Sequence, residues 1–199
     1  MKVIGFSGWS GSGKTTLVER VIASLVMAGQ RVSVVKHAHH DFDIDHPGKD
    51  TWRHRQAGAF EVVIASRRRL AKMREFEVEV QPTVHQLLAE LVDCDWVLIE
   101  GFKSADLLKI EVWREALGKP VQYPDDPFIV AIATDHPQRL PRSTGLPVLD
   151  LNAPDAVADF LLQNSARYEY RAPDSPWPAA DADARRGADA PASGGAAAG

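Results

Sequence analysis

The chain has 199 residues, of which 45% are hydrophobic and 25% charged, and it carries a formal net charge of −4 with a pI near 6.0. This length fits one α/β domain with a tail, and the acidic balance argues against a general nucleic-acid binder, which needs a basic face. Because Cys94 is the only cysteine, an intrachain disulfide and a four-thiolate zinc site within one chain are both excluded.

No secretory signal is predicted at the amino terminus. Residues 1–6 enter an apolar run without a charged leader or a small-residue cleavage site. No stretch of about 18 uncharged apolar residues occurs, so no membrane-spanning helix is predicted. We therefore expect a cytoplasmic protein without a membrane partner.

The first forty residues predict a strand, a glycine loop, a helix and a second strand. The apolar run 3–6 is a short strand, and apolar residues recur at helical spacing over about 14–28 before Gly29. The β-branched run in 31–36 predicts the next strand. Such a βαβ unit should have parallel strands.

The rest of the chain continues the alternation of strands and helices. A short helix is expected at about 51–57, and a β-hairpin over 59–66 and 70–80 has the basic run Arg67 to Arg69 at its tip. The remaining predicted elements are a helix over 83–92, strands at 95–100, 110–113, 128–133 and 148–151, and a helix at 155–163. The predicted fold is α/β: a P-loop NTPase-like three-layer sandwich with a mostly parallel sheet and a β-hairpin extension.

Two regions are expected along the chain. Residues 1–165 form the nucleotide-binding domain, and residues 166–199 form a tail. Beyond about Arg171 the composition changes to Ala, Asp, Pro, Ser and Gly. This segment lacks the apolar surface needed to offset its ordering entropy, so we predict a disordered tail.

The segment from Gly8 to Thr15 matches the pattern G-x-x-x-x-G-K-[ST] at every fixed position. It follows a predicted strand and opens a predicted helix. Its glycines allow backbone amides to converge on an anion, and the helix dipole favours phosphate there. Lys14 should reach the β- and γ-phosphates of a nucleoside triphosphate, and the Thr15 hydroxyl should ligate Mg²⁺.

A carboxylate on a neighbouring strand is expected to complete the magnesium site. The strand at 95–100 has Asp95 at its start and Glu100 at its end. If this strand is parallel to the first, its carboxyl end lies beside the P-loop, and Asp95 lies about 16 Å away. Glu100 is therefore the predicted acid.

A polar loop after the second strand is rich in histidine and aspartate. Calcium is excluded because His46 stands where an EF-hand loop needs glycine and Trp52 where it needs glutamate. His37, His39 and His40 could bind zinc or nickel, or form hydrogen bonds to nucleotide or substrate, and the second interpretation is preferred. Within this loop, Asp45 is the residue predicted to take part in nucleotide chemistry. Its carboxylate would orient water or accept a hydrogen bond from a magnesium-bound water.

Several separated segments together resemble the molybdopterin-guanine dinucleotide biosynthesis protein B (MobB) family over about residues 1–165. The segments are Gly8 to Thr16, Lys36-His37-Ala38-His39-His40, Gly48-Lys49-Asp50-Thr51 with Arg53, Ala57-Gly58-Ala59, and Ile99-Glu100-Gly101-Phe102-Lys103. One departure is Thr51, where serine would be expected, and the hydroxyl is retained.

The resemblance implies a homodimer that binds GTP and hydrolyses it weakly. It also implies an accessory role beside a MobA-type guanylyltransferase, which attaches GMP to molybdopterin, and it leaves molybdopterin open as a further ligand. The P-loop motif together with the resemblance gives the predicted phosphate contacts Gly8, Ser10, Gly11, Ser12, Gly13, Lys14, Thr15 and Thr16. Glu100 would be the acid beside Mg²⁺.

Base recognition needs a separate argument, because phosphate contacts do not distinguish guanine from adenine. Guanine offers two adjacent N–H donors to one carboxylate, and Asp135, after the strand at 128–133, is the predicted acceptor. A loop or capping role for Asp135 is equally compatible with the sequence. The N-K-x-D signature of many GTPases is absent.

Three other functions fit the same phosphate loop. A small-molecule kinase would transfer the γ-phosphate to a hydroxyl, with Arg67, Arg68 and Arg69 as a phosphate clamp. A metal-insertion GTPase would deliver nickel or zinc through the histidine loop. A structural adaptor would use its nucleotide only to stabilise a dimer.

Overall fold

The computed structural model describes residues 1–38 and 42–173. His39, His40 and Asp41 lie outside the described residues, as does the predicted tail from residue 174 onward. A central six-stranded sheet has the strand order β2-β5-β1-β6-β7-β8, and all its pairings are parallel. Its strands are β1 (Lys2–Ser7), β2 (Val32–Lys36), β5 (Trp96–Glu100), β6 (Lys109–Trp113), β7 (Ile129–Thr134) and β8 (Val148–Asp150).

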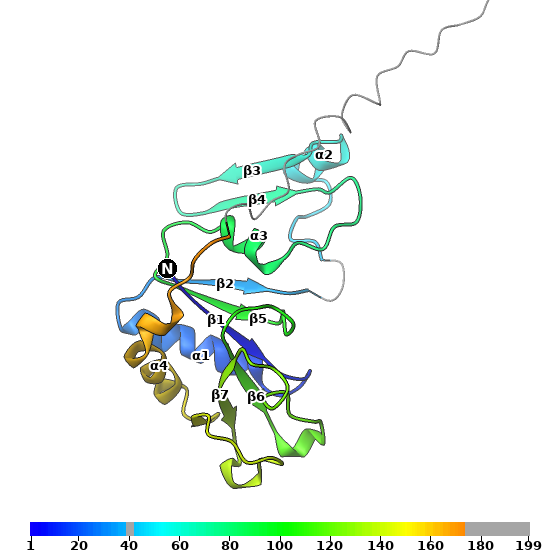
Figure 1. Cartoon of the computed structure of the whole chain (residues 1–199). Helices are drawn as coiled ribbons and strands as arrows, with labels where there is room; N and C mark the ends of the chain where they lie inside the picture. The colour runs from blue at the N-terminus through cyan, green and yellow to red at the C-terminus, as the bar shows by residue number, and fades with distance from the viewer. Residues whose placement is uncertain (39–41, 174–199) are drawn as a thin grey trace, which may run out of the picture.

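Helices cover both faces of this sheet, which confirms the predicted α/β class (Figure 1). Helices α1 (Lys14–Met27) and α4 (Pro154–Gln163) pack on one face, and α3 (Val84–Ala89) packs on the other. Successive side chains of a strand point to opposite faces of the sheet, so each strand contributes to the contacts on both faces. On β5, Trp96 and Leu98 join the α1 side, whereas Val97 and Ile99 join the α3 side.

The predicted β-hairpin is present as a separate two-stranded antiparallel sheet of β3 (Glu61–Ala65) and β4 (Leu70–Arg74). The short helix α2 (Asp50–Gln56) precedes it. Strand β4 is shorter than predicted because it follows its partner only to the Glu61–Arg74 pair, after which the Glu75 amide bonds the Phe60 carbonyl. Arg67 to Arg69 are exposed at the hairpin tip.

Helix α3 begins as predicted and ends three residues early. Thr83 accepts a hydrogen bond from the Gln86 amide, and the Gln86 side chain accepts from the Thr83 amide, which forms a capping box. At the other end, the Glu90 and Leu91 amides bond carbonyls three residues back, and Asp93 has a positive φ of 56°. This tightened turn redirects the chain into β5.

Contacts of the domain continue to Tyr170, just before the change in composition near Arg171. Tyr168 is buried against Trp96, and Glu169 forms an antiparallel bridge with Lys2. The short 3₁₀ turns are η1 (Glu115–Leu117), η2 (Pro137–Arg139) and η3 (Ser165–Tyr168). Across residues 1–38 and 42–173, no helix has the length and apolar character needed to cross a membrane.

Candidate functional site

The loop between β1 and α1 adopts a conformation that requires glycine at three places. Gly8, Gly11 and Gly13 have φ values of 136°, 81° and 90°, which side-chain-bearing residues rarely adopt. A Cβ on Gly8 would also lie 2.3 Å from the Val112 carbonyl oxygen. The loop therefore packs tightly against the neighbouring strand while it curves into the helix.

Helix α1 presents its amino terminus to the space enclosed by this loop. Gly13 is its N-cap residue, and the Leu17 amide bonds the Gly13 carbonyl at 3.0 Å. The first amides of a helix have no partner within the helix, and its dipole is positive at this end. The geometry fits an anion such as a phosphate group.

Lys14 folds back over the loop. Its Nζ atom donates to the carbonyl oxygens of Gly8 at 2.9 Å and Trp9 at 2.8 Å. Partial burial lowers the pKa of the Lys14 ammonium, with Glu100 opposing the shift and Lys36 adding to it. The cation is thus held at the centre of the loop by acceptors that a phosphate could replace.

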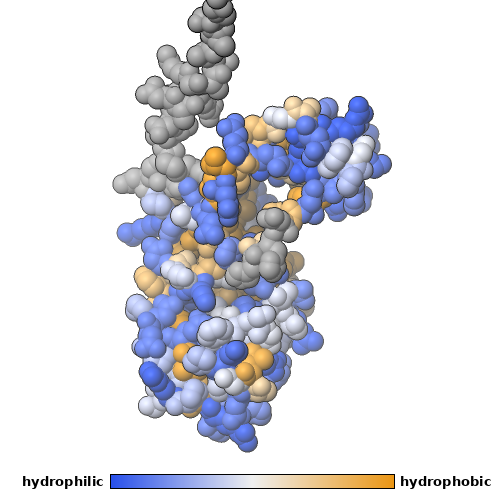
Figure 2. Space-filling model, turned by 90° about the vertical axis from the view of Figure 1, so that its right-hand side faces the viewer, coloured by the Kyte–Doolittle hydropathy of each residue, from blue (hydrophilic) through white to orange (hydrophobic). Residues whose placement is uncertain are grey.

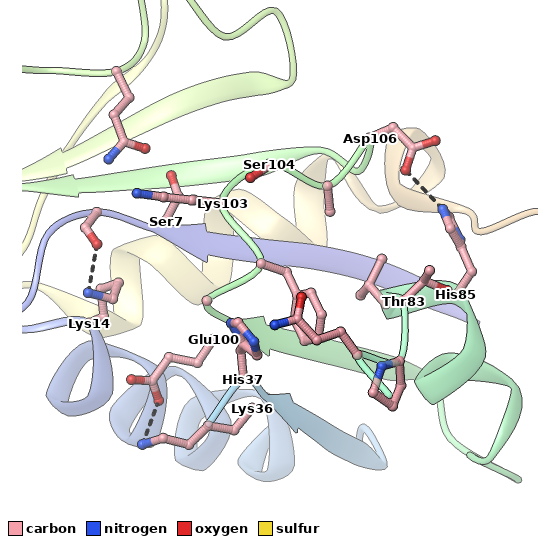
Figure 3. Close-up of a pocket in the computed structure, with 18 of the residues that line it drawn as sticks. Ser7, Lys14, Lys36, His37, Thr83, His85, Glu100, Lys103, Ser104 and Asp106 are labelled. Carbon is pink, nitrogen blue, oxygen red and sulfur yellow. Dashed lines mark hydrogen bonds and ion pairs between the residues drawn. The ribbon is translucent and has the colours of Figure 1, made fainter. Parts of the chain in front are cut away.

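Glu100 lies beside the loop, as the parallel pairing of β1 and β5 requires. Phe6 and Glu100 are register partners at the carboxyl ends of these strands. The Thr15 hydroxyl donates to Glu100 Oε1 at 2.5 Å. Lys36 Nζ lies 3.5 Å from Glu100 Oε2, and Figure 3 shows this ion pair. Asp95 is at the other end of β5, where it accepts from the Arg31 amide. A hydroxyl and a carboxylate oxygen in contact are ligand types that Mg²⁺ prefers, so the donor set fits this ion.

Asp135 lies on the other side of the loop, just after β7. Its Oδ2 atom accepts from Arg114 Nη1 at 2.5 Å, and Arg114 Nε donates to the Ser12 carbonyl at 3.1 Å. Arg114 therefore joins the phosphate loop to the predicted base-binding acid. Arg114 was not among the site residues predicted from the sequence. The available signal was its position directly after β6, the strand beside β1.

Asp45 lies in a charged network around α2. Its carboxylate accepts from Thr51 Oγ1 at 2.9 Å and from Arg55 Nε at 3.3 Å. Arg55 also pairs with Asp43 and Glu75, which connects the loop to the hairpin strand β4. The structure thus places Asp45 apart from Lys14 and Glu100, and its role in nucleotide chemistry stays a prediction.

The histidine loop is described only in part. The His37 ring lies 4.7 Å from that of Phe102, measured between centroids, and His37 N donates to the Glu100 carbonyl. Within residues 1–38 and 42–173, no group of three or more His, Cys, Asp or Glu side chains is arranged to hold a metal ion.

A cavity of about 820 Å³ opens beside the phosphate loop. Lys14 lines one end, Glu100 and His37 lie in its middle, and His85 of α3 lies at the far end. Figure 3 shows this progression, with the ion pair of Lys36 and Glu100 at one side. The cavity thus connects the phosphate loop to the α3 face of the sheet.

The parallel sheet, the glycine loop and the helix that follows define an α/β protein of the P-loop fold. Residues 3–135 match the model of the family described as MobB, molybdopterin guanine dinucleotide synthesis protein B. The chain belongs to this family.

Two relatives with matching names agree with this assignment. A protein of Escherichia coli (strain K12), named molybdopterin-guanine dinucleotide biosynthesis adapter protein, is 38% identical over 165 residues, covering 81% of this chain and 91% of the relative. A protein of the same name from Haemophilus influenzae is 39% identical over 162 residues, covering 80% and 86%.

Solved structures of the family share the fold. The crystal structure of molybdopterin-guanine biosynthesis protein B has 30% identity and a TM-score of 0.63, covering 81% of this chain and 97% of that one. A MobB homolog from Bacillus stearothermophilus has 26% identity and a TM-score of 0.60, covering 85% and 100%.

Proposed function

We propose that this protein binds Mg·GTP in its phosphate loop and acts as an adapter in molybdenum cofactor biosynthesis. It would assist a MobA-type guanylyltransferase that attaches GMP to molybdopterin, and the transfer chemistry would belong to that partner. One observation carries the proposal: the Thr15–Glu100 contact lies at the mouth of a glycine loop that encloses the amino terminus of α1.

Different groups in and beside the loop bind different parts of Mg·GTP. The backbone from Gly8 to Gly13 and the amides of Lys14, Thr15 and Thr16 hold phosphate oxygens. Lys14 exchanges its two carbonyl partners for the β- and γ-phosphates. Thr15 and Glu100 hold Mg²⁺, which when bound neutralises phosphate charge.

Hydrolysis is proposed to be weak. The carboxylate predicted to orient water, that of Asp45, is engaged by Thr51 and Arg55, and Asp45 does not line the cavity beside Lys14. Glu100 is engaged by Thr15 and Lys36. Because both carboxylates already accept hydrogen bonds or pair with cations, neither is poised to act as a general base.

Guanine selectivity is assigned to Asp135. Arg114 pairs with the Oδ2 atom of the Asp135 carboxylate. The Oδ1 atom is buried and has no hydrogen-bond partner among the described residues. A buried acceptor without a partner is uncommon in folded proteins, and the adjacent N–H groups of guanine would satisfy it. Adenine offers no such donor pair on that edge.

A homodimer is proposed through the hairpin. Val63 and Leu70, on one face of the hairpin, are 56% and 68% exposed, although they are large apolar residues. Figure 2 shows the hairpin as a lobe that stands off the body of the molecule. An isolated two-stranded hairpin is marginally stable, so pairing with a second copy would both bury this surface and support the hairpin.

Reconstituted guanylyl transfer tests the adapter role. The guanylyltransferase partner is supplied with molybdopterin and Mg·GTP, and molybdopterin guanine dinucleotide is measured with and without this protein. The wild-type protein should raise the yield, and Lys14→Ala should not. Equal yields with and without the wild-type protein would reject the adapter role.

A small-molecule kinase is the second candidate, because the cavity beside Lys14 could hold an acceptor hydroxyl. The arginine clamp considered for this reaction is not part of the cavity lining, since Arg67 to Arg69 occupy the hairpin tip. A phosphorylated acceptor formed from ATP would favour the kinase over the adapter.

A further inference from the structure

The cavity extends away from the side of the phosphate loop that carries Asp135. In the sheet order, β5 and β2 lie on one side of β1, and β6, β7 and β8 lie on the other. The cavity is lined mainly by the ends of β1, β2 and β5, the loop 101–106 and the start of α3, with Gln122 after β6, whereas Asp135 follows β7 and is not part of the lining. A nucleotide with phosphates in the loop and its base at Asp135 leaves the cavity beyond Glu100 free.

The charges along this cavity favour an anion. Lys14, Lys36 and Lys103 line it together with the acids Glu100 and Asp106, which gives a local excess of positive charge in a chain whose net charge is −4. Both acids are already engaged, Glu100 by Thr15 and Lys36, and Asp106 by His85 at 2.9 Å. Lys103 and Ser7 both line the cavity and are labelled in Figure 3.

A buried hydroxyl gives an independent sign of a ligand. Ser7 is 1% exposed and lines the cavity, and its Oγ atom has no hydrogen-bond partner among the described residues. Native proteins rarely leave a buried hydroxyl unpaired unless a ligand or water completes it. An anionic oxygen beside Lys103 would accept this hydrogen bond.

Aromatic rings supply flat apolar surface beside the cations. Phe102 and His37 form a tilted pair in the cavity wall, and the Trp9 ring lies 5.4 Å from Lys103 Nζ. Phe102 has a φ of 47°, and such strained positions in bulky residues cluster at binding sites. This combination suits a planar ring attached to a phosphate.

The buried side chain of Lys109 holds the loop that carries Phe102 and Lys103 in place. Lys109 is 2% exposed, and its Nζ atom donates to the carbonyls of Lys103 and Ala105, each at 2.8 Å, and pairs with Asp126 at 2.7 Å. A buried ammonium is tolerated only with such complete pairing. Lys109 is therefore a positioning residue for this wall of the cavity.

We propose that the cavity is a second ligand site, which takes a phosphate monoester of a fused planar heterocycle beside the bound nucleotide. Ser7 and Lys103 bind the phosphate, and Phe102 and Trp9 contact the ring. This inference rests on the proposed function, because it assumes that the nucleotide base lies on the Asp135 side. A pterin phosphate is the member of this class that fits the proposed pathway.

The test uses 6-hydroxymethylpterin monophosphate, followed by its fluorescence, with the full chain saturated by a non-hydrolysable GTP analogue and Mg²⁺. We expect saturable binding that Lys103→Ala weakens by about tenfold or more, as expected for a lost charge-assisted contact. Lys119→Ala is the matched control, because Lys119 also lies near the Trp9 ring, at 5.7 Å, but does not line the cavity. The phosphate-free 6-hydroxymethylpterin should bind more weakly than its phosphate.

Two outcomes overturn the second site. One is equal affinity of the wild type and Lys103→Ala for the pterin phosphate. The other is binding of the pterin phosphate to the nucleotide-free protein but not to the protein saturated with the GTP analogue, which would place it in the phosphate loop. Calorimetry of the GTP analogue on the same protein separates this failure from failure of the proposed function. Normal binding of the analogue without pterin binding rejects the second site alone.

Discussion

The Thr15 hydroxyl and the Glu100 carboxylate, 85 positions apart in the sequence, meet at a distance of 2.5 Å. The contact follows from the parallel register of β1 and β5, which ends both strands at the phosphate loop. Thr15 opens the helix that follows the loop, and Glu100 closes its neighbouring strand. The sheet topology thereby brings together the two groups that we propose to hold Mg²⁺.

Replacing Glu100 by Gln should weaken the contribution of Mg²⁺ to GTP binding. The amide keeps the size of the side chain and removes its charge, so GTP affinity at saturating Mg²⁺ should fall by about 10- to 100-fold. Affinity measured in EDTA should change little. Glu19→Gln on the exposed face of α1 is the control, and equal magnesium dependence in both variants would remove Glu100 from the metal site.

Asp135→Asn and Arg114→Gln should separate base recognition from support of the loop. Asp135→Asn should lower GTP affinity by about tenfold or more and leave ATP affinity nearly unchanged, because the proposed role of the carboxylate is to bind guanine and not adenine. Arg114→Gln should weaken both nucleotides, since Arg114 bonds the Ser12 carbonyl within the loop. Parallel titrations with GTP and ATP measure both affinities. If Asp135→Asn lowered the affinity for both nucleotides equally, Asp135 would support the phosphate loop and would not recognise the base.

GTP binding should weaken at alkaline pH. Burial lowers the pKa of Lys14, so its ammonium loses charge at a lower pH than an exposed lysine does. The charged form binds phosphate, and affinity should therefore fall as the pH rises towards this lowered pKa. Titrations between about pH 7 and pH 10 measure the effect. Lys14→Arg keeps its charge over this range and should show a flatter profile; parallel profiles would mean that another group titrates.

Charged substitutions on the hairpin should disrupt the proposed dimer. Val63 and Leu70 lie on one face of the β3–β4 sheet, as the pairs Val63–Lys72 and Ala65–Leu70 show. Val63→Glu or Leu70→Glu should shift the protein to monomers in analytical ultracentrifugation. Met27→Glu is the control, because Met27 is 88% exposed at the end of α1. A dimer that survives both hairpin substitutions would place the interface elsewhere.

The sequence predicted the elements because their signals are local. Helix α1 has its apolar residues at helical spacing, and the capping residue Thr83 marks the start of α3. Parallel pairing followed from the βαβ pattern, which was enough to select Glu100 over Asp95. Helix and strand ends were less accurate, since the end of β4 depends on where its partner begins.

The contacts missed from the sequence join distant positions. Arg114 reaches Ser12 over 102 positions, and no periodic pattern links them. Lys109 looks like an ordinary surface lysine in the sequence, yet it is buried beneath the loop of Phe102 and Lys103. The extent of the cavity depends on how α3 packs against the sheet, which local spacing does not specify.

Calorimetric titration of the wild type and Lys14→Ala with Mg·GTP and Mg·ATP tests the central claim most directly. The wild type should bind GTP more tightly than ATP, and Lys14→Ala should bind neither measurably, because the cation at the centre of the loop is gone. Unchanged affinity in Lys14→Ala would show that nucleotide phosphates do not bind in this loop.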